Sequence, residues 1–101
     1  MWMQIGVERI DTYEGIFMKA LLDSGATGLF MSKKCAQRGG FKLIKLEKPI
    51  LVRNVDGTGN SGDAILHEVE VNLYFKGHVE RVRMDVCDLE KTEVILGMPW
   101  L

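Results

Sequence analysis

A single carboxylate stands where the sequence leaves an apolar segment. Asp23, Ser24 and Gly25 follow directly after Ala20-Leu21-Leu22. A serine and a glycine after the aspartate allow the backbone to turn sharply. Because burying a lone carboxylate is costly unless it is paired or hydrogen-bonded, an aspartate at the end of a buried strand is expected to have a chemical role. The Asp-Ser-Gly sequence occurs once in the chain.

Two other segments bear on this turn. Val94-Ile95-Leu96 is an apolar run that stops at Gly97, as expected of a short buried strand. Residues 54–63 contain three glycines and two asparagines, a composition that predicts a loop and excludes a core segment. Apolar segments flank this loop, so we expect it to be the tip of a long hairpin.

Length and composition restrict the class of protein. A chain of 101 residues forms one small domain, spanning residues 1–101. The net charge of −1 provides no basic surface for nucleic acid, and no basic run exceeds Lys33-Lys34. No apolar run approaches the roughly 20 residues of a membrane helix, and the N-terminus lacks the pattern of a signal peptide. We therefore expect an intracellular protein that binds neither nucleic acid nor a membrane.

The cysteines and histidines do not form a metal-binding pattern. Cys35 and Cys87 belong to no Cys-x-x-Cys pair, and His67 and His78 have no ligand-like spacing to them. We expect two free thiols, no metal and no cofactor.

Turn signals divide most of the chain into short apolar or alternating segments, a pattern typical of a mainly β domain. Gln4–Arg9 and Ile16–Leu22 are expected to pair as a hairpin. Ser32 is expected to cap a short helix, Lys33–Gln37, that ends at Gly39-Gly40. The other expected strands cover Leu29–Met31, Pro49–Arg53, Val69–Phe75, Val82–Val86 and Val94–Leu96.

In their order along the chain, these segments resemble the retropepsin-like aspartic proteases. The Asp-Ser-Gly-Ala turn, the glycine-rich hairpin at Val55–Gly59 and the late Ile-Leu-Gly occur in that order and at suitable separations. The ending Ile95–Leu101 and the phrase Asn54–Gly59 are most similar to gypsy-type LTR retrotransposon proteases. The resemblance implies an all-β, retropepsin-like closed β-barrel with one short helix and one lobe per chain.

The resemblance also implies a reaction, the hydrolysis of peptide bonds by a water molecule held between two carboxylates. Two neighbouring carboxylates share a proton, so one acts as general base on the water and the other as general acid toward the carbonyl oxygen. Since each chain carries one such aspartate, the implied enzyme is a homodimer in which each subunit supplies its Asp23 on the two-fold axis. The implied substrate is a polypeptide, the Gag-Pol-like polyprotein of a retroelement, in the cytoplasm or within virus-like particles.

The expected site residues fall into two groups. The catalytic group is Asp23, Ser24 and Gly25. The substrate-binding group comprises Ala26, Thr27 and Ile95, which would line the groove, and Val55, Asp56, Gly57, Thr58 and Gly59, which would form a flap.

Two departures from the retroviral pattern leave alternatives open. Thr27-Gly28 and Met98-Pro99 stand where retroviral members carry acidic residues and an arginine, so the ion pair between those residues is unavailable. The chain stops at Leu101 with little room for a terminal dimer strand, which predicts a weaker dimer, a dimer formed by the N-terminal residues and the stub of the C-terminal helix alone, or a truncated domain. The alternative function is a catalytically idle retropepsin-like module for dimerisation or peptide binding. A ubiquitin-pathway relative with the same fold is a third option.

Overall fold

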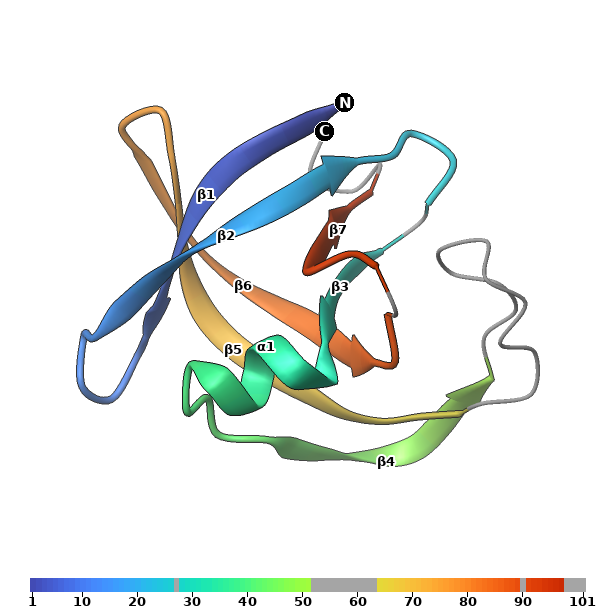
Figure 1. The fold of residues 1–101 in the computed structure, drawn as a ribbon. Helices are drawn as coiled ribbons and strands as arrows, with labels where there is room; N and C mark the ends of the chain where they lie inside the picture. Colours follow the sequence, from blue (N-terminus) through green and yellow to red (C-terminus); the bar gives the residue numbers. More distant parts are fainter. Residues whose placement is uncertain (27, 52–63, 90, 98–101) are drawn as a thin grey trace.

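The computed structural model describes residues 1–26, 28–51, 64–89 and 91–97, which form seven strands and one helix (Figure 1). Residues 27, 52–63, 90 and 98–101 lie outside the described part of the chain. The elements are β1 (Trp2–Arg9), β2 (Gly15–Leu22), β3 (Leu29–Ser32), α1 (Lys33–Arg38), β4 (Ile44–Leu51), β5 (Ala64–Phe75), β6 (His78–Cys87) and β7 (Val94–Leu96).

Six of the strands close into a barrel. The hydrogen-bonded order is β1-β2-β7-β3-β6-β5, and β5 pairs again with β1. The long strand β5 makes this closure possible: its second half pairs with β1, from Val71↔Arg9 to Tyr74↔Gly6, while its first half pairs with β4. The prediction of an all-β closed barrel with one short helix is confirmed.

The barrel interior holds the core. Side chains at alternate positions of β1 and β5 point inward and are almost fully buried, as the period-two pattern of β5 predicts. The other core positions come from β2, β3, β6 and β7. The fully buried side chains in this cluster include Ile5, Val7, Met18, Met31, Val69, Val71, Leu73, Met84, Val94 and Leu96.

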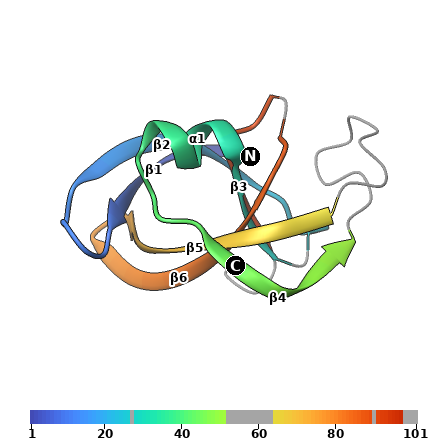
Figure 2. The same cartoon turned by 90° about the horizontal axis from the view of Figure 1, so that it is seen from below.

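The helix forms where its capping residues predict it. The Ser32 hydroxyl accepts a hydrogen bond from the Cys35 N–H at 3.0 Å, and the Gly39 N–H donates to the Cys35 carbonyl at the other end. Gly40 then adopts a φ of +66°, a conformation that favours glycine. Figure 2 shows α1 on one side of the ring of strands, where it buries Cys35 and Ala36.

Strand β4 differs from the prediction. It begins at Ile44 instead of Pro49 and continues through the proline to Leu51. Proline is tolerated there because β4 is the last strand in the order, pairs only with β5, and shifts its register between Lys45 and Ile50. Strand β1 also begins earlier than predicted, because Trp2 and Met3 pair with the end of β2.

Three further features concern the described residues alone. Cys35 and Cys87 form no disulfide bond there. No group of three or more metal-binding side chains occurs within the described ranges. In the same part of the chain, no helix has the length and apolar character needed to cross a membrane.

Shortening Leu73 to alanine should destabilise the barrel. Leu73 is 1% exposed and lies where β5 closes on β1, so Leu73→Ala is expected to lower the free energy of unfolding by about 2–5 kcal/mol. Leu66→Ala on the same strand is the matched control, because Leu66 is 48% exposed and should change stability by no more than about 0.5 kcal/mol. Urea denaturation measures both; equal losses would contradict this packing.

Candidate active site

Strand β2 delivers Asp23 to a turn that hydrogen bonds close tightly. The Asp23 N–H donates to the Leu96 carbonyl of β7 at 3.0 Å. Within the turn, the Gly25 N–H donates to the Asp23 carboxylate oxygen Oδ1 at 2.9 Å, and the Ala26 N–H donates to the Asp23 carbonyl at 3.1 Å. An aspartate that accepts from the backbone two residues later stabilises a turn, so both the main chain and the side chain of Asp23 have fixed positions.

The far end of the turn is held by the same strand. The Gly97 N–H, directly after β7, donates to the Gly28 carbonyl at 3.0 Å. A side chain at position 97 has no room, because its Cβ would collide with the Gly28 carbonyl oxygen and lie 2.7 Å from that of Ala26. The late Ile-Leu-Gly segment therefore supports the turn, and close packing of the backbone requires its glycine.

Asp23 is less buried than the sequence suggested. In the single chain Asp23 is partly exposed, and Ser24 and Gly25 are exposed. The turn lies at an end of the barrel rather than within it, which leaves these groups accessible. The catalytic roles of Asp23, Ser24 and Gly25 stay predictions, since the structure describes one chain.

An apolar row lies beside the turn, on the face of the sheet opposite the core. Ile95 of β7 is directly opposite Leu21 of β2 and Phe30 of β3. Directly paired residues share a face, and none of the three belongs to the barrel core. Ile95, predicted to line a groove, is 0% exposed, whereas Leu21 and Phe30 are partly exposed. Sequence reasoning did not single out Leu21 or Phe30; the available signal was strand alternation, which puts Leu21 on the same face as Asp23.

The remaining predicted residues are only partly covered by the structure. Ala26 lies in the turn and is partly buried. Thr27 and the predicted flap, Val55, Asp56, Gly57, Thr58 and Gly59, lie outside the described residues. The strands on either side of that segment, β4 and β5, pair antiparallel, with Leu51 opposite Ala64.

Comparison with known proteins agrees with this geometry. Residues 19–101 match the family model of the PEG10/RTL1 protease domain. The chain belongs to this protease-domain family. Its fold is retropepsin-like; the closer relation to gypsy-type proteases stays a prediction.

Solved structures share the fold of this PEG10/RTL1 protease domain. The retroviral protease-like domain of Ddi1 from Leishmania major superposes with a TM-score of 0.62 at 18% identity, covering 100% of this chain and 73% of that chain. The EIAV protease in complex with an inhibitor superposes with a TM-score of 0.58 at 22% identity, covering 96% of this chain and 80% of that chain. A retropepsin-like aspartic protease from Rickettsia conorii superposes with a TM-score of 0.53 at 18% identity, covering 96% of this chain and 80% of that chain.

A carboxyl group with a raised pKa continues the apolar row of the protease domain. Asp85 of β6 lies opposite Phe30 and, on its other side, opposite Glu68 of β5. Burial, together with the negative charge of Glu68, raises the pKa of Asp85. Arg83 pairs with Glu68 at 3.1 Å. Only the strand register reveals this position of Asp85.

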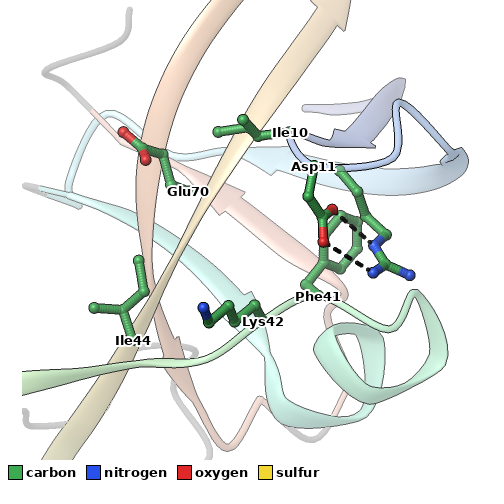
Figure 3. A pocket seen from close by; sticks show the side chains of 7 residues that line it. Ile10, Asp11, Phe41, Lys42, Ile44 and Glu70 are labelled. Atoms are coloured by element: carbon green, nitrogen blue, oxygen red, sulfur yellow. Dashed lines mark hydrogen bonds and ion pairs between the residues drawn. The ribbon is translucent and has the colours of Figure 1, made fainter.

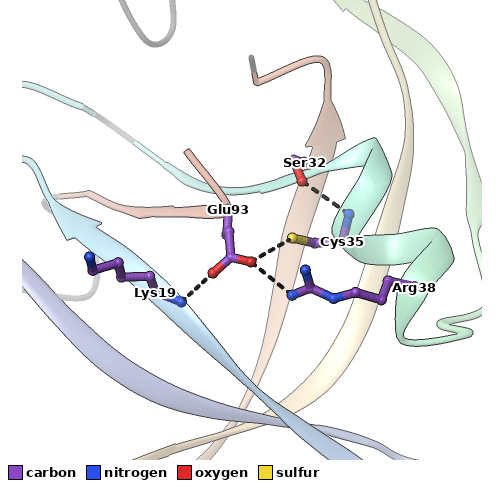
Figure 4. Close-up of polar contacts among 5 residues, drawn as sticks. All are labelled: Lys19, Ser32, Cys35, Arg38 and Glu93. Atoms are coloured by element: carbon purple, nitrogen blue, oxygen red, sulfur yellow. Dashed lines mark hydrogen bonds and ion pairs between the residues drawn. The ribbon is translucent and has the colours of Figure 1, made fainter. Parts of the chain in front are cut away.

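A second polar cluster, also missed by sequence reasoning, surrounds Glu93 immediately before β7 (Figure 4). Its Oε1 accepts from the Lys19 backbone N–H at 2.7 Å. Its Oε2 accepts from Arg38 Nη2 at 2.8 Å and from the Cys35 thiol at 3.7 Å. Burial alone would raise the pKa of Glu93, but these hydrogen bonds outweigh it and hold the pKa below its ordinary value.

The hollow in Figure 3 lies apart from Asp23. It has a volume of about 190 Å³ and contains none of the predicted site residues. Arg9 and Asp11 form an ion pair of 3.2 Å at its edge. Its lining residues are Arg9, Ile10, Asp11, Phe41, Lys42, Ile44 and Glu70.

Adding a methyl group at position 97 should distort the turn. Gly97→Ala is expected to lower the free energy of unfolding by about 1–3 kcal/mol, because backbone carbonyls must move to admit the Cβ. Gly28→Ala is the control: its Cβ would lie 3.3 Å from the end of the Phe30 ring, which can rotate away. Chemical denaturation of the two variants compares them, and a Gly97→Ala protein no less stable than the control would contradict the close contact.

The contribution of the Glu93 hydrogen bonds to the free energy of unfolding should decrease in acid. Because the folded-state pKa of Glu93 is lowered, its stabilisation is fully present above its ordinary pKa of 4.5 and is lost as the pH falls through the folded-state value. Glu93→Gln should therefore be less stable than wild type at neutral pH, and the difference should shrink toward about pH 3. Urea midpoints across this range test the sign, with Glu47→Gln on exposed β4 as control. A difference that grew in acid would refute the assignment.

Proposed function

We propose that this chain is an aspartic endopeptidase of the retropepsin type that acts as a homodimer. The observation that carries the proposal is the Asp23 turn: a partly exposed carboxylate, fixed through Leu96 and Gly25, at the end of a closed barrel. A fixed and accessible carboxylate is the half-site that such an enzyme needs. The proposed substrate is a polypeptide of the Gag-Pol-like class encoded by retroelements, in the cytoplasm or within virus-like particles.

The reaction requires two such carboxylates. In the proposed dimer the pair shares one proton, because two adjacent carboxylates do not both ionise readily. The ionised member removes a proton from water, whose oxygen attacks the peptide carbonyl carbon, while the protonated member donates its proton to the carbonyl oxygen. Transfer of a proton to the amide nitrogen then accompanies cleavage of the C–N bond. The Gly25 N–H, bonded to Oδ1 of Asp23, orients the carboxylate.

Surface next to the turn supports assembly of two copies. The N-terminus lies beside the end of β2. The Leu22 N–H donates to the Met1 carbonyl at 2.8 Å, and Trp2 pairs with Leu21. Met1 and Trp2 are 82% and 50% exposed, so two apolar side chains beside the last residues of β2 are open to solvent. Covering them with a second copy would remove apolar surface from water and bring the two turns together.

The same surface suggests what the enzyme would bind. Leu21 and Phe30 are partly exposed on the face that carries Asp23, which favours apolar substrate side chains next to the cleaved bond. We propose that Ala26, Thr27 and the segment Val55–Gly59 complete the groove, the latter closing over the substrate as a flap that excludes water.

Replacing the carboxylate tests the chemistry. Asp23→Asn should fold like wild type but lose peptide cleavage by at least about a thousandfold, since an amide does not act as general base. Digestion of a peptide library by wild type and Asp23→Asn measures this, with Asp88→Asn, an exposed position, as the matched control. Cleavage that survives in Asp23→Asn would refute the mechanism, and no cleavage by wild type would favour the idle binding module.

The same variant tests the dimer. When an excess of Asp23→Asn is added to a fixed amount of wild type, mixed dimers with one carboxylate should form and activity should fall. The Asp88→Asn protein added in the same amount should not reduce it. Activity unaffected by excess Asp23→Asn would contradict a site shared between two copies.

A further inference from the structure

The position of the Asp23 turn depends on a strand of only three residues. Strand β7 lies between β2, to which it is parallel, and β3, to which it is antiparallel. At its C-terminal end, the Leu96 carbonyl holds Asp23 and the Gly97 N–H holds Gly28. Any tilt or slide of β7 therefore moves both ends of the turn at once.

Glu93 fixes the other end of this strand. Its backbone carbonyl accepts from the Ser32 N–H at 2.9 Å, which attaches it to the end of β3. Its carboxylate oxygen Oε1 accepts from the Lys19 N–H of β2 at 2.7 Å, one residue before the β2–β7 pairing begins at Ala20. The side chain thus extends the short parallel ladder by one bond, and this bond has a charged acceptor, which makes it stronger than an ordinary backbone pair.

The second carboxylate oxygen connects the strand to the helix. Oε2 accepts from Arg38 Nη2 at 2.8 Å and from the buried Cys35 thiol at 3.7 Å. Figure 4 shows the carboxylate of Glu93 between β2 on one side and α1 on the other. One side chain therefore joins β2, β7 and α1, at the end of β7 opposite the catalytic turn.

We propose that Glu93 is a positioning residue for Asp23: by fixing β7 against β2, it sets where the Leu96 carbonyl holds the turn. The catalytic part of this inference rests on the proposed function, but the mechanical part does not. Glu93 does not touch the turn itself, so its effect on Asp23 passes through β7. The link to Lys19 carries the positioning, and the links to Arg38 and Cys35 fix the carboxylate.

Three variants separate these roles. Glu93→Ala removes every side-chain bond. Glu93→Gln keeps an oxygen that accepts from the Lys19 N–H but presents an amide NH₂ in place of the acceptor for Arg38. Arg38→Ala removes the ion pair to the helix alone. Glu80→Ala, an exposed carboxylate on β6, is the matched control.

Amide hydrogen exchange measured by NMR gives a result that does not depend on activity. In Glu93→Ala, exchange at the Lys19 and Asp23 amides should accelerate at least about tenfold more than at the core amide of Leu73, because the β2–β7 pairing opens locally. In Glu93→Gln, Arg38→Ala and Glu80→Ala, the acceleration of exchange at the Asp23 amide should differ from that at the Leu73 amide by no more than about threefold. Equal acceleration at all three amides in Glu93→Ala, or none, would overturn the proposal by making Glu93 a general stabilising residue or an irrelevant one.

Kinetics then test the catalytic consequence. A misplaced Asp23 should lower kcat of Glu93→Ala by about 10- to 100-fold with KM changed less than about threefold, since the chemistry depends on geometry more strongly than binding does. Glu93→Gln should restore most of kcat. If wild type cleaves no peptide, the proposed function fails while the exchange experiment still decides the positioning role. If Glu93→Ala loses Asp23 protection but keeps wild-type kcat, the catalytic part of the inference is wrong.

Discussion

Two backbone hydrogen bonds from one buried strand hold the candidate site together. The Asp23 N–H to the Leu96 carbonyl and the Gly97 N–H to the Gly28 carbonyl, both 3.0 Å long, tie the two ends of the turn to β7. These bonds form only if β7 can enter between β2 and β3 and if position 97 carries no side chain. The three apolar residues of β7 satisfy the first condition because all are fully buried, and glycine satisfies the second.

The rest of the fold gives this strand a fixed place. Closure of β5 onto β1 makes a ring in which β2, β7 and β3 each have two neighbours, so none of the strands that carry the turn is a free edge. The edge strand of the sheet is β4, which tolerates Pro49 because an edge strand has neighbours on one side only. A rigid barrel thus supports the turn. A fixed support under the carboxylate is what precise catalytic geometry requires.

The sequence predicts the local parts of this arrangement and fails where distant segments must meet. Asp23-Ser24-Gly25, the Ser32 cap and the Val94–Leu96 strand are recognisable because each depends on residues next to one another in the chain. The Glu93 carboxylate is bonded to Lys19 and Arg38, 74 and 55 residues away, and no periodicity encodes those pairings. Likewise, Leu21, Phe30 and Asp85 share a face only through strand register, and the partial exposure of Asp23 follows from the turn lying at the end of the barrel.

Two kinds of carboxylate in this molecule have opposite electrostatic requirements. The proposed pair of Asp23 carboxylates works only when it holds one proton. Glu93 binds the helix most strongly when it is ionised, because protonation weakens its charge-assisted hydrogen bonds to Arg38 and to the Lys19 N–H. The hydrogen bonds that lower the pKa of Glu93 reconcile these requirements, since they keep this residue charged at a mildly acidic pH. Burial and the charge of Glu68 raise the pKa of Asp85, a shift opposite in sign to that of Glu93. The two carboxyl groups differ because each has a different set of hydrogen-bond donors and charges around it.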